Sequence, residues 1–366
     1  MLLKNCTIIK EEQIMEIKIG NLEISNGGRP FFIADIAANH DGDLERALML
    51  IEKAKEAGAD VAKFQNFKAP KIVSKNAFDA MPRQTHQAGW SKSVFEVYSD
   101  ASLTDEWTEK LKEKCEEVGI EYMTSPYDFE SVDWADKYSN AFKIGSGDIT
   151  WTEMLKYIAG KNKPVLLATG AADMCDVERA VSTVSQINKQ LILMQCNTNY
   201  TVDDENFKCI NLNVLKTYRQ KYPELILGLS DHTPGHTTVL GAIALGARVI
   251  EKHFTDDNNR IGPDHKFAMN PKTWKAMVDE SMNLYYALGD GVKKVEKNEN
   301  ESRLVQQRSC YYLRDLEIGH MITKEDIFPV RPICEDGYFP YENELIIGQR
   351  LKRSVKADTP VRKGDF

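Results

Sequence analysis

The stretch LILGLSDHTPGH (225–236), together with RVIEKHF (248–254) further along the chain, decides the predicted fold. Each begins with an apolar run that is typical of a buried strand, and each carries a histidine at or just after the end of that run. The segment between them has the pattern of a helix, so the two runs predict neighbouring parallel strands joined by a helical crossover. We therefore expect His232 and His253 to meet at the carboxyl ends of two adjacent strands.

The same alternation of short apolar runs and helical segments extends back to residue 30. The other predicted strands are 30–37, 60–65, 120–125, 141–146, 164–170 and 191–196. Helical segments lie between them, such as 44–58 and 104–119, which end in glycine at Gly58 and Gly119 as helices often do. Eight strands with helices in about 260 residues predict an α/β fold, the (β/α)8 or TIM barrel. A doubly wound open sheet is the alternative, but it would need a G-x-G-x-x-G loop after an early strand, which the sequence lacks.

The patterns divide the chain into four parts. Residues 1–29 are an N-terminal extension, expected to form a β-hairpin, and 30–288 form the barrel. The charged run 289–308 is typical of a linker, and 309–366 form a small β-rich unit of about 60 residues, marginal by itself. The strand-like runs of this unit are SCYYL (309–313), IIGQ (346–349) and RSVK (353–356). Within the barrel, an insertion at 66–103 is long enough to predict a functional loop or lid.

Composition restricts the classes of function. The chain has 366 residues, of which 42% are hydrophobic and 28% charged, as in ordinary globular proteins. Its net charge of −8 argues against nucleic acid or an anionic membrane as the main partner. No apolar run approaches the roughly 20 residues of a membrane span. The 7 cysteines include no C-x-x-C pair, which indicates reduced thiols in a cytosol. We therefore expect a cytoplasmic enzyme.

Polar residues stand at or just after the end of every predicted strand, where a barrel of this type has its active site. They are Asp35, Lys63, Gln65, Ser125, Ser146, Asp148, Thr169, Thr198, Tyr200, Ser230, His232 and His253. A single residue of this kind would more often than not be a satisfied structural group. Their presence at all eight strand ends together indicates a site.

The two histidines suit a divalent metal ion with open positions for water and substrate. Imidazole ligands favour manganese, zinc, cobalt or iron over magnesium. The alternative is one ligand histidine, His232 or His253, beside one that only forms hydrogen bonds.

Lys63 is expected to hold an anionic substrate, because a lysine on an apolar strand is costly to bury without an anion. It could instead form a Schiff base with a carbonyl substrate, but Schiff-base and metal strategies are usually alternatives. Asp35, Asp148 and Asp264 are available for proton transfer or for binding sugar hydroxyls. The hydroxyls that would add donors around the anion are Ser125, Ser146, Thr198 and Ser230.

Several segments closely resemble the sialic acid (N-acetylneuraminate) synthase family. They are FIADIAANHDGD (32–43), KFQ (63–65), KIGSGD (143–148), GLSDHT (228–233) and EKHFTDDNNRIGPDH (251–265). The segment IGHMITKEDIFPVRP (318–332) resembles the antifreeze-like (SAF) domain that ends those enzymes. The resemblance covers the chain from about residue 30 to its C-terminus.

The resemblance implies condensation of phosphoenolpyruvate with an open-chain N-acetylated amino-sugar, giving a nonulosonic acid and phosphate by C–O cleavage. The sugar would be N-acetylmannosamine or a diacetamido-trideoxyhexose. By the same resemblance His232 and His253 hold Mn²⁺, which polarises the aldehyde. Phosphoenolpyruvate contacts would fall on Lys63, Ser125, Ser146, Thr198 and Ser230, and sugar contacts on Gln65, Tyr200 and Asp264. Arg331 matches an arginine that the SAF domain inserts into the partner's active site, which implies a domain-swapped homodimer.

The sequence departs from the family pattern at positions assigned to acid/base chemistry and to the sugar. Asp35 and Asp148 stand where family members have glutamate, and each shortens the reach by one methylene. Ala168 replaces a small hydroxyl residue. Two other hypotheses remain open: a metal-assisted aldolase or lyase that uses pyruvate, and a non-catalytic carbohydrate-binding protein, which would be expected to lack ligands such as Lys63.

Overall fold

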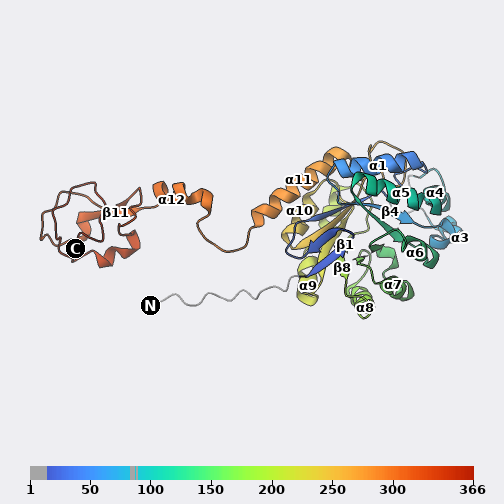
Figure 1. Cartoon of the computed structure of the whole chain (residues 1–366), viewed down its shortest axis with the longest axis horizontal. Coiled ribbons are helices and arrows are strands. Elements are labelled where there is room, and N and C mark those ends of the chain that lie inside the picture. The colour runs from blue at the N-terminus through green and yellow to red at the C-terminus, as the bar shows by residue number, and fades with distance from the viewer. Residues whose placement is uncertain (1–14, 83–86, 88–89) are drawn as a thin grey trace. The chain divides into compact units, whose positions relative to one another are not determined.

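The computed structural model describes residues 15–82, 87 and 90–366. The chain divides after Gly289 into two compact units. In the first unit, eight parallel strands close into a barrel with helices around it (Figure 1). The predicted (β/α)8 fold is confirmed, and the closed barrel rules out the open sheet.

The barrel strands are neighbours in chain order, and the last pairs with the first to close the ring. They are β3 (Phe31–Asp35), β4 (Val61–Asn66), β5 (Glu121–Pro126), β6 (Phe142–Ile144), β7 (Val165–Ala168), β8 (Leu191–Cys196), β9 (Ile226–Asp231) and β10 (Ala247–His253). Each falls on a predicted run. β6 is shorter than expected, because the chain turns after Ile144 into the short 3-10 helix η2 (Ser146–Asp148).

Helices follow the strands and cover the outside of the barrel. They are α1 (Leu44–Glu56), α5 (Asp105–Val118), α6 (Phe129–Ala135), α7 (Thr152–Ala159), α8 (Met174–Ser185), α9 (Val214–Lys221), α10 (Thr237–Ala244) and α11 (Pro271–Leu288). α5 ends at Gly119, whose left-handed φ of 72° explains why glycine closes that helix. Among the residues described, no helix combines the length and apolar character needed to cross a lipid bilayer.

Alternation along the strands creates two separate hydrophobic layers. Phe32, Phe64 and Ile250 pack outward against the helices, whereas Ile33 and Val61 belong to a second cluster inside the barrel. Because side chains of a strand alternate between faces, the inward positions that follow in β3, β4 and β10 are polar. Those positions carry Asp35, Lys63 and Glu251.

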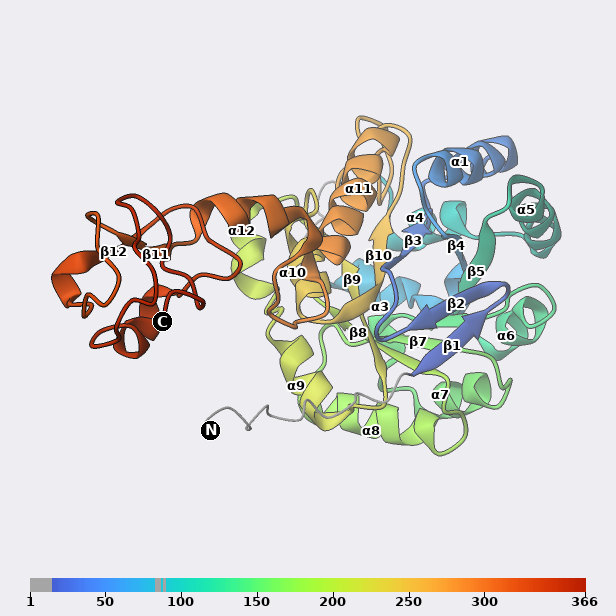
Figure 2. The ribbon, with the colours of Figure 1, turned by 60° about the vertical axis from the view of Figure 1, so that its left-hand side comes forward.

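An antiparallel hairpin precedes the barrel and is made of β1 (Glu16–Ile19) and β2 (Leu22–Ser25). Its residues Ile17, Ile19 and Ile24 join the cluster inside the barrel. Figure 2 shows the hairpin of β1 and β2 lying across one end of the barrel. The hairpin therefore covers the amino-terminal mouth and leaves the polar mouth at the other end. Residues 1–14 of the predicted extension lie outside the described residues.

The described part of the insertion after β4 contains the short helices α2 (Ala69–Ile72), α3 (Lys75–Ala80) and α4 (Val94–Ala101). It has a small hydrophobic cluster of its own, in which Val73 and Val94 are buried. This cluster gives the predicted functional loop an internal support at the carboxyl ends of the strands.

The second compact unit contains an antiparallel pair, β11 (Ser309–Tyr312) and β12 (Ile327–Val330). The strand predicted at 309–313 is confirmed, but the strands predicted at 346–349 and 353–356 are wrong. The first of these segments follows the 3-10 helix η6 (Pro340–Leu345), and the second contributes only an isolated bridge. Such short pieces are held by turns and buried carboxylates rather than by a ladder, so periodicity gives no signal. The segment predicted as a linker contains η4 (Lys297–Glu299) and α12 (Asn300–Gln306).

Candidate active site

The structure brings the two predicted histidines together. His253 is the last residue of β10, and His232 directly follows the adjacent β9. Their ring centroids lie 5.4 Å apart, and each residue is only 8% exposed. The pair therefore lies at the polar mouth of the barrel, in a setting that is largely protected from water.

Hydrogen bonding defines the tautomer of one imidazole and leaves the other available. Nδ1 of His232 lies 2.9 Å from the backbone oxygen of Asn197. A carbonyl oxygen can only accept, so Nδ1 carries the proton and Nε2 keeps its lone pair. Nδ1 of His253 is buried and has no hydrogen-bond partner among the described residues. Burial lowers the pKa of both histidines to about 4, so both rings are neutral at pH 7.

These features fit a divalent metal ion. Neutral imidazoles from His232 and His253 supply two lone-pair donors. Within the described part of the chain, no group of three or more His, Cys, Asp or Glu side chains is arranged to hold an ion. A metal bound here would therefore keep positions open for water and substrate. Tyr200 and Phe267 pack against the pair, with centroids 4.4 Å from His232 and 5.0 Å from His253 respectively.

A buried cluster of lysines and carboxylates lies beside the histidines. Asp35 stands opposite both Lys63 and His253 in the registers of three adjacent strands. Nζ of Lys63 lies 2.7 Å from Oδ2 of Asp35. On the other side, Nζ of Lys143 lies 2.8 Å from Oε1 of Glu251, which is also 3.9 Å from Lys63. Two cations and two carboxylates thus compensate one another in a nearly dry interior.

Burial and charge act in opposite directions on these groups. Burial disfavours the charged form of Lys63, but Asp35 and Glu251 outweigh it and raise the pKa of the lysine. Burial would raise the pKa of Glu251, but Lys143 and Lys63 lower it to about 2. Burial raises the pKa of Asp35 more than Lys63 lowers it. Asp35 is therefore the carboxyl of this cluster best suited to take up a proton.

A cavity of about 410 Å³ opens at this mouth of the barrel, with His253 in its wall. Its polar wall comes from the strand ends and includes Gln65, Ser146, Asp148, Thr198, Tyr200, His253 and Asp264. Its apolar wall comes from the insertion and includes Phe67, Ile72, Trp90, Val97, Tyr98 and Ala101. The insertion thus lies over the strand ends, as a functional loop would.

Small residues allow close approach in the polar wall. The Gly170 N–H donates to Oγ of Ser146 over 2.9 Å. A Cβ at Gly170 would lie 2.5 Å from Cγ2 of Thr198, so a larger residue would displace that threonine. Asp148 lines the cavity nearby, and burial raises its pKa to about 6.

The barrel residues predicted for the site all come to its polar mouth. They are Asp35, Lys63, Gln65, Ser125, Ser146, Asp148, Thr198, Tyr200, Ser230, His232, His253 and Asp264. Ser230 lies below the cavity and donates to Oε1 of Glu251 over 3.2 Å, and Ser125 is buried in β5. Arg331 follows β12 in the second compact unit.

Two charged residues of the cluster, Lys143 and Glu251, were missed by sequence reasoning. The signal was available, because both occupy inward positions of their strands, in KIGSGD and EKHF. Tyr98 and Tyr127 also line the cavity. Tyr98 gives no such signal, since it lies on a helix of the insertion and not on a barrel strand.

Comparisons with known proteins agree with this architecture. The family model described as the NeuB family matches residues 50–293, and that of the SAF domain matches residues 307–366. The N,N'-diacetyllegionaminic acid synthase of Legionella pneumophila is 36% identical over 335 residues, covering 90% of this chain and 92% of its own. A pseudaminic acid synthase of Campylobacter jejuni is 31% identical over 357 residues, covering 96% and 100% respectively. The crystal structure of the N-acetylneuraminic acid synthetase of Leptospira borgpetersenii, in complex with citrate, has a TM-score of 0.70 at 29% identity, covering 80% of this chain and 96% of its own.

Proposed function

Because the chain belongs to the NeuB family, we propose that it condenses phosphoenolpyruvate with the open-chain aldehyde of an N-acetylated amino-sugar. The products are a nonulosonic acid and phosphate. The observation that carries this proposal is the alignment of His253, Asp35 and Lys63 on three adjacent strands, with His232 beside them. It is supported by the names of the relatives, which are synthases of legionaminic and pseudaminic acid.

His232 and His253 are proposed to hold a divalent metal ion, most simply Mn²⁺. When bound, the ion would supply Lewis-acid polarisation of the aldehyde oxygen. The protein's part is to present two neutral imidazoles. The bond from Nδ1 of His232 to Asn197 fixes the ring orientation that this requires.

Lys63 and Lys143 are proposed to hold the phosphoenolpyruvate anion. Both are buried lysines at inward positions of their strands, and they pair with Asp35 and Glu251 respectively. An anion that enters would share these lysines and gain hydroxyl donors from the surrounding strand ends. The hydroxyl groups available for this are those of Ser125, Ser146, Thr198 and Ser230.

In the proposed reaction, C3 of phosphoenolpyruvate forms a bond to the aldehyde carbon of the sugar. The carbon–carbon double bond of phosphoenolpyruvate becomes a single bond, and the aldehyde oxygen takes up a proton and becomes a hydroxyl. A water molecule adds to C2 and gives up one proton. The C2–O bond to phosphate then breaks as the new C2 hydroxyl loses its proton to the leaving phosphate, so that one water is consumed for each phosphate released. Asp35 is placed to receive the proton of that water, since its pKa is raised and it contacts Lys63. The insertion would limit access of bulk water to the cavity while the C–C bond forms and the C–O bond breaks.

We propose a diacetamido-trideoxyhexose, rather than N-acetylmannosamine, as the acceptor sugar. The apolar wall formed by Ile72, Val97 and Tyr98 suits the methyl group of a 6-deoxy sugar and the methyls of two acetamido groups. A free 6-hydroxyl against this wall would lose hydrogen bonds to water without replacement.

The Schiff-base alternative is disfavoured, because Lys63 is held protonated by its carboxylates.

Phosphate release provides the direct test. Purified protein with phosphoenolpyruvate, Mn²⁺ and a panel of N-acetylated aldoses should release phosphate with at least one sugar, and chelation of the metal should stop it until Mn²⁺ is restored. Pyruvate in place of phosphoenolpyruvate should give no product. Product formation from pyruvate would favour the aldolase or lyase instead, and no turnover with any sugar would count against the proposal.

Asp148 is expected to make kcat/KM for the sugar fall on the acidic side of its pH profile. Its pKa is raised to about 6 by burial, so the carboxyl is neutral below that pH and charged above it. If the charged form accepts hydrogen bonds from the sugar, kcat/KM for the sugar should rise with pH through about 6. The histidines titrate lower, near 4. In the Asp148→Asn variant, this fall of kcat/KM toward acid should disappear from the pH profile. If the fall persists in the variant, another group causes it.

Arg331 is proposed to reach the active site of a second copy in a domain-swapped homodimer. Arg331→Ala should then raise KM for the sugar by about tenfold, the cost of one charged hydrogen bond, with KM for phosphoenolpyruvate little changed. Arg350→Ala, in the same compact unit, is the matched control and should behave as wild type. A chain ending at Gly289 that kept full activity as a monomer would contradict the swap.

A further inference from the structure

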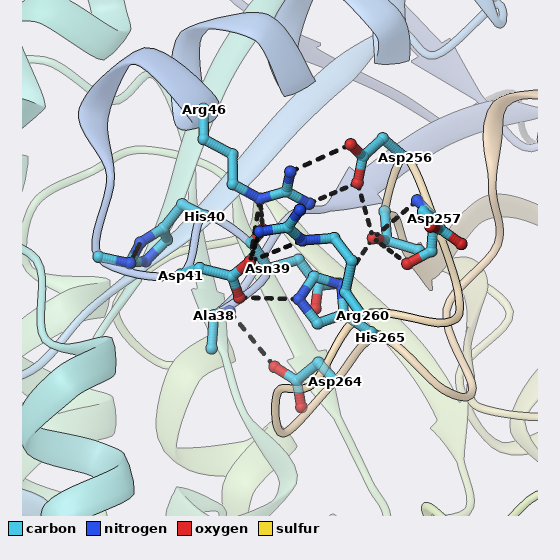
Figure 3. A network of polar contacts seen from close by, with 12 residues as sticks. Ala38, Asn39, His40, Asp41, Arg46, Asp256, Asp257, Arg260, Asp264 and His265 are labelled. Carbon is cyan, nitrogen blue, oxygen red and sulfur yellow. Dashed lines mark hydrogen bonds and ion pairs between the residues drawn. The ribbon is translucent and has the colours of Figure 1, made fainter.

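Two loops that border the cavity are joined by a network of polar contacts (Figure 3). One loop, residues 36–43, follows β3, and the other, residues 254–270, follows β10. Asp41 is shared by both halves of the network. Its Oδ1 accepts from Nε2 of His265 over 2.8 Å, and its Oδ2 accepts from Nε of Arg260 over 2.9 Å. Asp41 also lies 3.1 Å from Nε of Arg46, which pairs with Asp256, and Nδ2 of Asn39 donates to the backbone oxygen of Phe254, so Asp41 is one of several links between the loops.

His265 is fixed from several sides although it lies outside the cavity wall. It is fully buried, with 0% exposure. Its second ring nitrogen, Nδ1, lies 2.7 Å from Oγ1 of Thr255. Its backbone oxygen accepts from Nδ2 of Asn258 over 2.8 Å. A Cβ at Gly262 would lie 2.5 Å from Cδ2 of the ring, so the loop is folded closely around this histidine.

The neighbouring residue, Asp264, does line the cavity. Its Oδ2 accepts from the backbone N–H of Ala38 over 3.3 Å and lies 3.9 Å from Nδ1 of His253. The direction of this carboxylate therefore depends on the loop after β3 through Ala38, and on the backbone that His265 holds in place.

The loop after β3 has a backbone that depends on such support. Ala37 and Asp41 adopt φ values of 45° and 54°, in the left-handed region that is unfavourable for residues other than glycine. Conformations of this kind persist where the surroundings impose them, and they cluster at functional sites. Ala37 directly precedes Ala38, whose N–H contacts Asp264, and Asp41 follows three residues later.

We propose that the hydrogen bond between Asp41 and His265, together with the contact to Thr255, is a positioning device that aims Asp264 at the acceptor sugar. The inference rests on the proposed function, and it takes Asp264 as a sugar contact because this carboxylate lines the cavity and the sequence resemblance implies that role. Neither Asp41 nor His265 touches the reacting atoms; they act through the two loop backbones.

The test compares variants that remove one partner of Asp41 at a time. His265→Gln keeps a donor toward Asp41 but loses the contact to Thr255, and His265→Ala loses both. Asp41→Asn keeps a residue that tolerates the left-handed backbone and loses the charge. Arg260→Gln is the matched control, since it removes the ion pair that Nε and Nη2 of Arg260 form with Oδ2 of Asp41 but leaves His265 in place.

The measured quantities are KM for each substrate, kcat and the thermal midpoint of the full chain. His265→Gln and Asp41→Asn should raise KM for the acceptor sugar about tenfold, as loss of supporting hydrogen bonds typically does. KM for phosphoenolpyruvate should stay within about twofold. His265→Ala should be more severe than His265→Gln, and Arg260→Gln should match wild type.

Equal changes in both KM values, or a lower thermal midpoint with an unchanged KM for the sugar, would overturn the inference while the proposed function stands. If His265→Ala does not fold, Asp41→Asn and His265→Gln still decide between these outcomes. A wild-type protein that turns over no sugar would instead overturn the proposed function, and this inference with it.

Discussion

Replacement of His232 by alanine is expected to lower turnover about a thousandfold or more while the barrel remains folded. The imidazole is one of only two donors in the proposed metal site, and a metal that polarises an aldehyde contributes several kcal/mol to the transition state. The side chain makes one hydrogen bond to the backbone oxygen of Asn197, so its loss should cost the fold little. Steady-state phosphate release and Mn²⁺ affinity by calorimetry measure the two effects.

His236 supplies the matched control for this substitution. It is the residue before α10, close in sequence to His232, and no described contact places it in the cavity. His236→Ala should retain Mn²⁺ affinity and activity, and both variants should keep the circular dichroism of the wild type. Wild-type activity in His232→Ala would remove the metal site from the mechanism.

Replacement of Lys63 by methionine is expected to affect both binding and stability. The variant keeps the length of the side chain. It leaves Asp35 buried without the ammonium of Lys63, whose Nζ lies 2.7 Å from Oδ2 of Asp35. Breaking such a pair costs about 3–5 kcal/mol of the free energy of unfolding. Loss of the anion-binding ammonium should raise KM for phosphoenolpyruvate about a hundredfold, which corresponds to about 2.7 kcal/mol.

The loss of stability in this variant should depend on pH with a definite sign. Without Lys63, the pKa of Asp35 rises further above its ordinary value, so folding favours the protonated carboxyl. The destabilisation should therefore be smallest in acid and grow as the pH rises above the ordinary range of an aspartate. Urea unfolding at several pH values measures this trend.

Lys252 separates the two effects of the Lys63 substitution. It is also fully buried and pairs with Asp231, but on the outer face of β9 and β10, away from the cavity. Lys252→Met should lose comparable stability and keep KM for phosphoenolpyruvate within a few-fold. If both variants lost substrate affinity equally, Lys63 would have a structural role only.

The sequence was sufficient to predict the barrel, because each strand is a short apolar run followed by a helix with a clear period. Side chains alternate between the two faces of a strand. The sequence alone therefore predicts that Ile33 and Asp35, two residues apart in β3, lie on the same face. The strands of the second unit could not be predicted in the same way. The segment at 346–349 contains Gly348 with a φ of 87°, and the turn chemistry there overrides the apolar pattern.

The sequence predicted which polar residues lie at the same mouth of the barrel, but not how they pair with one another. Lys63, His232 and His253 all lie at or near the carboxyl ends of predicted strands, so the sequence predicts that they share one end of the barrel. That Lys63 pairs with Asp35 follows from the register of β3 and β4, which no local pattern specifies. The bridge from Asp41 to His265 joins residues from opposite ends of the barrel sequence, and it emerges only when β10 pairs with β3.

The most direct measurement is anomalous X-ray scattering at the manganese edge, from crystals grown with Mn²⁺ and phosphoenolpyruvate. The account predicts one strong peak in contact with the imidazoles of both His232 and His253, with the enolpyruvate against Lys63. A peak elsewhere, or none at a Mn²⁺ concentration that supports turnover, would contradict it.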